Sequence, residues 1–453
     1  MKKLIALLLA VVMVMGLAAC GSKTTTETKA PTEAKVDTPT TEAETDAPAA
    51  AGSVYYLNFK PEFDQALQGL AASYTEKTGV PVKVVTAASG DYSNTLNAQM
   101  GKDGAPTVYN IGNMSGLKDW DECALDLTGS ALAGELATHD FNLYNEAGEL
   151  KAMGYCYESF GIIVNTKLLA DAGHSLDEIK DFASLKAVAD DIHARAAELG
   201  FDAFSSAGLD GSSSWRFSGH LANMPLYYEF RDDGVTEQPA EIKGTYLDNF
   251  RNIWDLYITD SAADPTALST ATGDQSEAEF GEGKAVFYQN GTWEYAALTA
   301  DKFNLNPDEI AMIPIYCGVD GEEKAGLCSG TENCWAINSQ AKEEDIQASL
   351  DFLYWLVTDP DASAVLVEQL GAVPFKSCPA SANKFIVDGN ALLADGKYAV
   401  TWAFNYTPNV DSWRATVVTA LAAYSADPTD ANWEAVKTAF VDGWAIEYKT
   451  VNG

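Results

Sequence analysis

Basic residues are scarce in this chain. Its 453 residues hold 29 lysines and arginines against 65 aspartates and glutamates, so the formal net charge is −36 at pH 7. A protein that binds nucleic acid or another polyanion needs a basic surface that displaces counterions from the phosphates. We therefore expect no nucleic-acid partner and favour a neutral or cationic ligand, although an acidic surface also serves solubility.

Cysteine and histidine offer little metal or redox chemistry. The seven cysteines include no C-x-x-C pair, and the four histidines do not fall near them at the spacing of metal ligands. We therefore expect neither a metal nor a cofactor. Apart from Cys20, six cysteines permit fifteen pairings, and the sequence leaves the number of disulfides open. They are Cys123, Cys156, Cys317, Cys328, Cys334 and Cys378.

Common enzyme motifs are also missing. The chain has no G-x-S-x-G elbow, H-E-x-x-H pair, P-loop or dinucleotide fingerprint. This favours a binding protein over an enzyme. A glycosidase needs only two carboxylates, however, so a glycan-cleaving enzyme stays open as an alternative.

The N-terminus has the pattern of a secretory signal. Lys2 and Lys3 precede sixteen uncharged, largely aliphatic residues at 4–19, and small residues then precede Cys20. The apolar run is shorter than the ~20 residues that a membrane span needs. The run Leu17-Ala18-Ala19-Cys20 resembles the lipobox of bacterial lipoproteins. This implies removal of residues 1–19, a lipid on Cys20, and a protein anchored at the extracellular face of the cell membrane.

A disordered linker is predicted at 20–52. From 21 to 52 the chain has nine threonines, seven alanines, three prolines and six acidic residues, and no aromatic residue. Such a segment cannot bury enough apolar surface to fold. As a coil it would span ~30 Å. Its predicted role is to hold the folded part of the protein near the membrane.

The folded part begins with a βαβαβ pattern. Apolar runs at 54–59, 82–86 and 107–111 read as buried strands, and helical periodicity separates them at 61–79 and 92–101. Strands that are apolar on both faces are typical of a parallel sheet covered by helices. We therefore predict an α/β fold, with length enough for two domains.

Further elements follow. Two strand-like runs, 152–157 and 160–164, lie on either side of Glu158, and a strand at 285–289 precedes a predicted turn at Asn290-Gly291. Another strand is predicted at 335–337. The predicted helices are 166–172, 184–199, 215–222, 245–260, 343–358, 361–370, 414–426 and 430–445.

Three segments carry a family resemblance. These are YESFGIIVNTK at 157–167, FGEGKAVFYQNGTW at 280–293 and SGTE at 329–332, the last followed by a helix pair. With the signal, the linker and the βαβαβ start, their order resembles the maltose-binding-like extracellular solute-binding proteins of ABC importers. The resemblance implies a two-lobed, type II periplasmic-binding-protein-like fold with a hinge and an inter-lobe cleft. Lobe one would comprise 53–158 and 324–376, and lobe two 159–323 and 377–453.

The resemblance also implies a function. The chain would capture a neutral oligosaccharide as a monomer and deliver it to ABC permease subunits. Three alternatives remain: a lipid-anchored glycan-cleaving enzyme, the same fold with a peptide, polyamine or metal chelate as ligand, and a surface sensor or adhesin.

Candidate ligand residues lie at strand ends and in aromatic loops. Sugars need flat rings for their C–H faces and fixed polar partners for their hydroxyls. In lobe one the candidates are Lys60, Glu62, Asp91 and Asn113, with helix capping as the alternative for Asp91.

The remaining candidates follow the strands and loops near the predicted cleft. Trp293 and Glu158 match family positions that contact the ligand. Alternatively, Trp293 is a core residue. The alternative for Glu158 is a carboxylate that is hydrogen-bonded or paired within the protein. A late cluster includes Phe404, and spacing does not tell which of its rings faces the ligand. The candidates of this group are Glu158, Trp215, Arg216, Trp293, Glu332, Trp402, Trp413 and Arg414.

Overall fold

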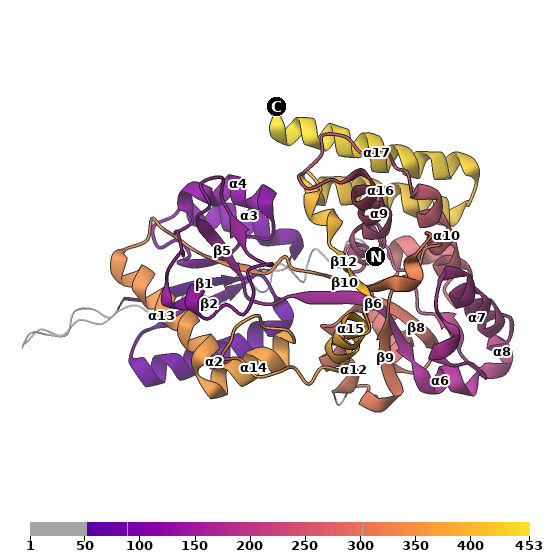
Figure 1. Cartoon of the computed structure of the whole chain (residues 1–453), viewed down its shortest axis with the longest axis horizontal. Helices are drawn as coiled ribbons and strands as arrows, with labels where there is room; N and C mark the ends of the chain where they lie inside the picture. Colours follow the sequence, from indigo (N-terminus) through magenta and orange to yellow (C-terminus); the bar gives the residue numbers. More distant parts are fainter. Residues whose placement is uncertain (1–51, 88, 301) are drawn as a thin grey trace, which may run out of the picture. The chain divides into compact units, whose positions relative to one another are not determined.

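The computed structural model describes residues 52–87, 89–300 and 302–453 (Figure 1). The predicted signal peptide, Cys20 and nearly all of the predicted linker lie outside the described residues. Within the described part of the chain, none of the helices combines the length and the apolar character that crossing a bilayer requires.

A first sheet has six strands in the order β2-β1-β3-β11-β5-β4, and β11 comes from the second half of the chain. β1 pairs in parallel with β2 and β3, as the βαβαβ pattern predicts, whereas β11 runs antiparallel to β3 and β5. All five residues of β1 are buried, which explains its continuous apolar sequence. The strands are β1 (Val54–Asn58), β2 (Val82–Thr86), β3 (Val108–Asn110), β4 (Leu143–Tyr144), β5 (Leu150–Gly154) and β11 (Cys334–Ile337).

Helices accompany this first sheet, and local signals set their ends. α2 ends at Gly79, whose φ of 78° suits glycine. Asp359 caps α14 by accepting hydrogen bonds from the amides of Asp361 and Ala362, and Pro360 occupies the first helical position. The helices are α2 (Asp64–Thr78), α3 (Ser89–Met100), α4 (Met114–Trp120), α5 (Ala131–Gly134), α13 (Glu343–Thr358) and α14 (Pro360–Leu370).

A second sheet follows the order β12-β10-β6-β8-β7, with β9 paired to the C-terminal half of β6. β6 is antiparallel to β8, β9 and β10, so this sheet is mixed. Its strands are β6 (Glu158–Asn165), β7 (Asp202–Phe204), β8 (Ala285–Gly291), β9 (Ile310–Ile313), β10 (Ala325–Gly330) and β12 (Tyr398–Thr401). The helices of this part are α6 (Thr166–Asp171), α7 (Phe182–Ala194), α8 (Ala196–Leu199), the π-helix η4 (Arg216–Leu221), α9 (Asn223–Asp233), α10 (Leu247–Thr259), α11 (Gly273–Gly281), α12 (Glu294–Thr299), α15 (Lys384–Ala394), α16 (Val410–Ala426) and α17 (Asp430–Asn452).

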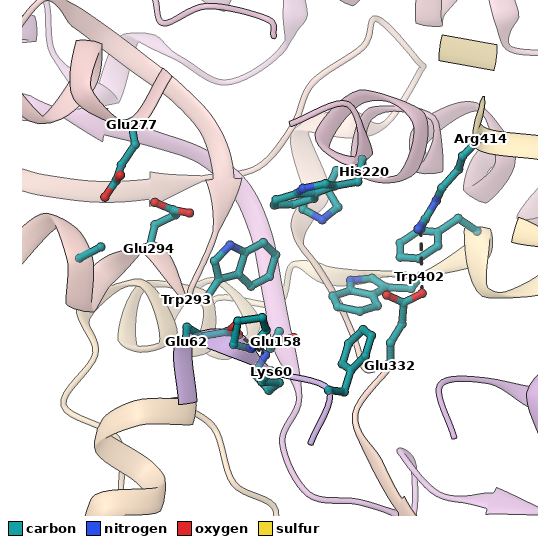
Figure 2. Close-up of a pocket in the computed structure, with 15 residues that line it drawn as sticks. Lys60, Glu62, Glu158, His220, Glu277, Trp293, Glu294, Glu332, Trp402 and Arg414 are labelled. Carbon is teal, nitrogen blue, oxygen red and sulfur yellow. Dashed lines mark hydrogen bonds and ion pairs between the residues drawn. The ribbon is translucent and has the colours of Figure 1, made fainter. Parts of the chain in front are cut away.

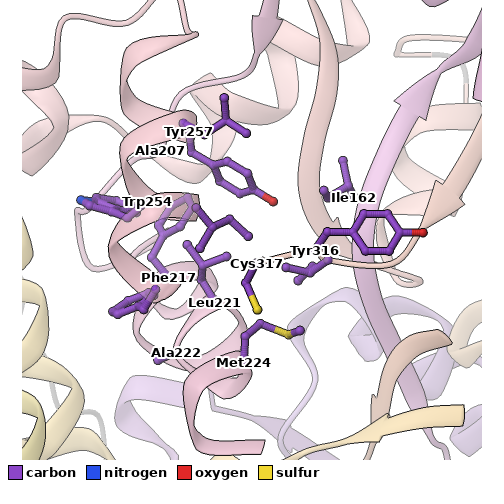
Figure 3. Close-up of a cluster of buried hydrophobic side chains, with 14 of the residues drawn as sticks. Ile162, Ala207, Phe217, Leu221, Ala222, Met224, Trp254, Tyr257, Tyr316 and Cys317 are labelled. Atoms are coloured by element: carbon purple, nitrogen blue, oxygen red, sulfur yellow. The ribbon is translucent and has the colours of Figure 1, made fainter. Parts of the chain in front are cut away.

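Each sheet has its own hydrophobic core. The largest cluster belongs to the second sheet and joins residues of β6, η4 and α10 (Figure 3). Trp254 and Tyr257 of α10 lie within it, as do the sulfur-containing side chains of Met224 and Cys317. Separate clusters form around the first sheet. Two sheets with separate cores are the physical basis of a two-lobed α/β fold.

Three neighbouring segments connect the two sheets: 155–157, 331–333 and 371–383. The amide of Tyr155 donates to the carbonyl of Asn333 at 3.0 Å, and the amide of Tyr157 donates to the carbonyl of Ala372 at 2.9 Å. The hydroxyl of Thr331 donates to the carbonyl of Cys156 at 2.6 Å. The three connections therefore lie side by side and are hydrogen-bonded to one another.

The end of β8 and the place of β10 differ from the predictions, and the structure also shows the state of the cysteines. β8 continues through the predicted turn at Asn290-Gly291, because Gly291 pairs with Phe160 of β6. β10 pairs with β6 and β12 of the second sheet, so residues 325–330 lie with lobe two and not with lobe one as expected. The six cysteines of the described residues are free thiols, so no disulfide joins them.

Candidate functional site

A cavity of about 430 Å³ lies beside the connecting segments (Figure 2). Residues that follow strands of both sheets line it: Lys60 follows β1, and Trp293 follows β8. Pockets for small ligands commonly form between lobes in this way. The lining residues are Phe59, Lys60, Pro61, Glu62, Glu158, Trp215, His220, Glu277, Trp293, Glu294, Ala297, Glu332, Trp402, Phe404 and Arg414.

Lys60 and Glu158 form a buried ion pair on the cavity wall. Lys60 Nζ lies 2.7 Å from Glu158 Oε1 and 2.8 Å from Glu62 Oε1. The side chains of Lys60 and Glu158 are only 7% and 8% exposed, and Asn333 donates to the second oxygen of Glu158 at 2.8 Å. Burial alone would lower the pKa of Lys60, but the carboxylates of Glu158 and Glu62 outweigh it and raise the pKa well above its usual value. The pair thus joins the end of β1 to the start of β6.

Trp293, Trp215 and His220 form one aromatic wall. The ring centroid of Trp293 lies 5.9 Å from that of Trp215 and 5.4 Å from that of His220. Trp293 is half-buried, and its ring lies against Gly291, where an added Cβ would come within 2.1 Å of the ring. Burial and the charges of Arg414 and Arg216 hold the pKa of His220 well below its usual value, so the imidazole is neutral.

Trp402, Phe404 and Arg414 form the opposite side. The ring of Trp402 stacks on Phe404 at 5.3 Å, and its indole N–H donates to the carbonyl of Cys328 at 3.1 Å. The guanidinium of Arg414 lies 5.0 Å from the centre of the Phe404 ring, and its Nη2 lies 3.9 Å from Glu332 Oε1. Burial raises the pKa of Glu332, although Arg414 opposes the shift. This side therefore combines flat rings with polar groups of both signs.

Glu294 and Glu277 occupy the end of the cavity beyond Trp293 (Figure 2). Glu277 pairs with Lys302 at 2.9 Å. Glu294 is half-buried, and its Oε1 accepts a hydrogen bond from Asn290 Nδ2 at 2.9 Å. Burial and then the charge of Glu277 raise the pKa of Glu294 to about 7.

A second cavity, of about 780 Å³, adjoins the first and shares Phe59, Glu332 and Arg414 with it. Its other walls are rich in amide side chains, including the predicted residue Asn113. The side chain of Asn113 caps α4 by accepting a hydrogen bond from Gly116 N, so it has a structural role as well. The two cavities together form a continuous polar and aromatic surface.

Three of the predicted site residues lie outside the two cavities. Trp413 is fully buried, and its indole N–H donates to the carbonyl of Phe440, so its ring belongs to the α16–α17 core. Arg216 is buried outside the cavity lining, where its Nη2 donates to the carbonyl of Ser206. Asp91 is exposed in the first turn of α3 and lies outside both cavities.

The other predicted residues come together. Eight of them line the first cavity: Lys60, Glu62, Glu158, Trp215, Trp293, Glu332, Trp402 and Arg414. The predicted ligand residues did not include Phe59, His220, Glu277 or Glu294, which also line the cavity. Phe59 and Glu294 directly adjoin the predicted residues Lys60 and Trp293, and this proximity was the available signal.

Comparisons with known proteins agree with this architecture. The profile of the bacterial extracellular solute-binding proteins matches residues 69–391, and the chain belongs to this family. The family is one of binding proteins that act outside the cell. No curated protein matches the sequence.

Solved structures of sugar-binding proteins share the fold. RafE in complex with raffinose aligns with a TM-score of 0.70 at 16% identity, covering 88% of this chain and 99% of RafE. The GacH receptor of Streptomyces glaucescens aligns with a TM-score of 0.64 at 19% identity, covering 88% of this chain and 98% of that one. A sugar transporter protein of Bacillus licheniformis, in complex with stachyose, aligns with a TM-score of 0.66 at 14% identity, covering 87% of this chain and 100% of that one. At these identities the likeness establishes the two-lobed fold.

Proposed function

We propose that this protein captures an oligosaccharide in the cavity between its lobes and delivers it to the permease of an ABC importer. The observation that carries this proposal is the aromatic lining. Trp293, Trp215 and Trp402 all border one cavity, and flat rings suit the C–H faces of sugar rings. RafE and the Bacillus licheniformis protein, which share the fold, were each solved with an oligosaccharide.

The polar groups of the cavity support the same ligand class. Carboxylates, Lys60 and Arg414 alternate with the rings and offer both acceptors and donors to hydroxyls. The volume of about 430 Å³ falls within the roughly 300–1,000 Å³ of small-molecule sites. A thermal-shift screen against purified glycans, accompanied by a reducing-end assay, would identify the ligand and separate capture from cleavage. If no glycan raises the melting temperature, the sugar assignment is wrong.

Ligand binding should make the protein more compact. Groups from both lobes line the cavity, so contacts to both exist only when the lobes close on the ligand, and this differential affinity shifts the equilibrium. We expect the radius of gyration from small-angle X-ray scattering to fall when a glycan identified by the screen is added. An unchanged radius at saturating ligand would instead indicate a rigid site.

We also propose that Cys20 carries the membrane anchor. The support is the lipobox-like sequence, since Cys20 lies outside the described residues. In Cys20→Ala no thioether can form, so we expect unprocessed or soluble protein in place of protein in the membrane fraction. Detergent partitioning of the two forms, expressed in a bacterium, measures this. Equal partitioning of the variant and the natural protein would rule the anchor out.

A further inference from the structure

One end of the cavity carries more negative charge than the protein neutralises. Figure 2 shows Glu277 and Glu294 on the same side of Trp293, with their carboxylates turned toward each other. Glu277 is paired with Lys302. Glu294 Oε1 accepts a hydrogen bond from Asn290, but no donor among the described residues reaches Glu294 Oε2.

The neighbouring cations are used elsewhere. Lys60 is held between Glu158 and Glu62. Arg216 lies behind the cavity and donates to Ser213 Oγ and to the carbonyl of Ser206. The lining of the cavity thus includes five glutamates against Lys60 and Arg414, while His220 is neutral. With Lys302 and the buried Arg216 counted as well, five glutamates face four cations, so one negative charge remains in excess.

The pKa of Glu294 is raised chiefly by burial, and the charge of Glu277 adds to the shift. Arg216 opposes the shift, and the weaker effects of Glu62 and Lys302 act in opposite directions, Glu62 favouring the protonated form and Lys302 the charged form. A carboxylate in such surroundings is stabilised when a cation arrives. A ligand that brings a positive charge would therefore gain an interaction that an uncharged ligand cannot make.

His220, on the other side of Trp293 from Glu294, provides a second and independent sign of a ligand in this cavity (Figure 2). His220 is only 5% exposed, and its ring stacks on that of Phe160 with 3.9 Å between the ring centroids. His220 Nδ1 lies 3.2 Å from Gln289 Nε2. The other ring nitrogen, His220 Nε2, has no hydrogen-bond partner among the described residues, and the ring lines the cavity. Nε2 of this largely buried ring is therefore open to the cavity, where a hydroxyl group of a ligand can form a hydrogen bond with it.

We propose that the oligosaccharide carries a free amino group: a ring stacked on Trp293 places its ammonium at Glu294 Oε2, while a neighbouring hydroxyl reaches His220. This inference rests on the proposed function and specifies its ligand class. A polyamine would satisfy Glu294, but it has no ring faces for Trp293, Trp215 and Trp402. An amino sugar uses both the charge and the rings.

Calorimetric titration with matched sugars tests the proposal. Short oligomers of glucosamine and of galactosamine are compared at pH 7 with their N-acetylated counterparts of equal length, which carry an uncharged acetamido group in place of the ammonium. We expect the free-amine form of at least one pair to bind about 10- to 100-fold more tightly, the range typical of one charge-assisted hydrogen bond. Glu294→Gln should bring the two affinities close together, whereas Glu282→Gln, at an exposed position on the end of α11, should keep the preference.

The outcomes separate this inference from the proposed function. Binding of N-acetylated or other neutral glycans alone would overturn the inference and leave oligosaccharide capture intact. Binding of spermidine in place of any sugar, or no binding of amino sugars and neutral glycans, would overturn both.

A melting experiment checks that the variant acts through this charge. The pKa of Glu294 is raised from 4.5 to about 7 in the folded state, so the folded state holds this proton more tightly than the unfolded state does. The resulting contribution to the free energy of unfolding is fully present below pH 4.5 and is lost as the pH rises through 7. Glu294→Gln removes this loss. Its melting temperature should therefore exceed that of the natural protein by more at pH 8 than at pH 5, and the opposite trend would contradict the assignment.

Discussion

Replacing Trp293 by alanine is expected to weaken oligosaccharide binding by ~30- to 1000-fold, while the melting temperature of the free protein changes little. Truncating an aromatic anchor at the centre of a site costs roughly 2–4 kcal/mol of binding free energy. Trp293 is half-buried and borders the cavity, so its removal in the free protein leaves a wetter wall and no sealed void. Calorimetric titration and a thermal melt of the same variant measure both quantities.

A matched control is Trp355→Ala. Trp355 is also half-buried, but it lies on α13 and its indole N–H donates to Asp359 Oδ2. This variant should melt earlier and keep the ligand affinity. If Trp293→Ala behaves in the same way as Trp355→Ala, then Trp293 is a core residue and the proposed stacking is wrong.

Replacing Lys60 by methionine is expected to lower the free energy of unfolding by about 3–5 kcal/mol. The substitution leaves Glu158 as a buried carboxylate without its cation, and the penalty for such a group exceeds the value of the pair itself. Urea denaturation of the ligand-free protein measures the change. The effect on ligand affinity is recorded separately, because both residues line the cavity.

Two further variants give this prediction its controls. Lys384 pairs with Asp388 at 2.7 Å within one turn of α15, and both side chains are more exposed than those of Lys60 and Glu158. Lys384→Met should therefore lower the free energy of unfolding by only about 0.5 kcal/mol. The double variant Lys60→Met/Glu158→Gln should be more stable than Lys60→Met alone, since it removes the unpaired charge. A cost for Lys60→Met no larger than that for Lys384→Met would show that the buried pair is unimportant for stability.

Sequence patterns predicted the elements whose periodicity is strong. The β1–α2–β2–α3–β3 unit was predicted with its parallel pairing, because β1 is an apolar run and α2 buries Leu67, Leu70 and Tyr74 at helical spacing before Gly79 ends it. α13 was predicted at its observed bounds, Glu343–Thr358. The start of α16 was placed at Arg414, four residues late. Asn409 at the cap position makes no capping hydrogen bond, and its side chain instead donates to Glu447 of α17, a contact that the local sequence does not reveal.

Adjacent candidate residues could not be told apart from the sequence. Neighbours on a helix point about 100° apart, so Arg414 reaches the cavity while Trp413 packs toward α17. The same holds for Trp215, which borders the cavity, and Arg216, which does not. Which of two neighbours faces a site depends on how the helix is docked, and that is decided by residues far away in the chain.

Residues without a motif were missed altogether. His220 and Glu277 acquire their significance only because η4 and α11 bring them next to Trp293 and Glu294. In a chain with 65 acidic residues, a glutamate that faces a cavity has no sequence feature that separates it from one that faces solvent.

The three hydrogen-bonded connections also determine how relative motion of the lobes can be observed. Side-by-side links oppose sliding and separation and leave rotation about a line near residues 156, 332 and 372 as the soft motion. Displacement in a rotation grows with distance from its axis. A pair of fluorescent labels, one in each lobe and both far from the connections, would therefore report ligand occupancy with a large signal, whereas labels beside the connections would stay nearly silent.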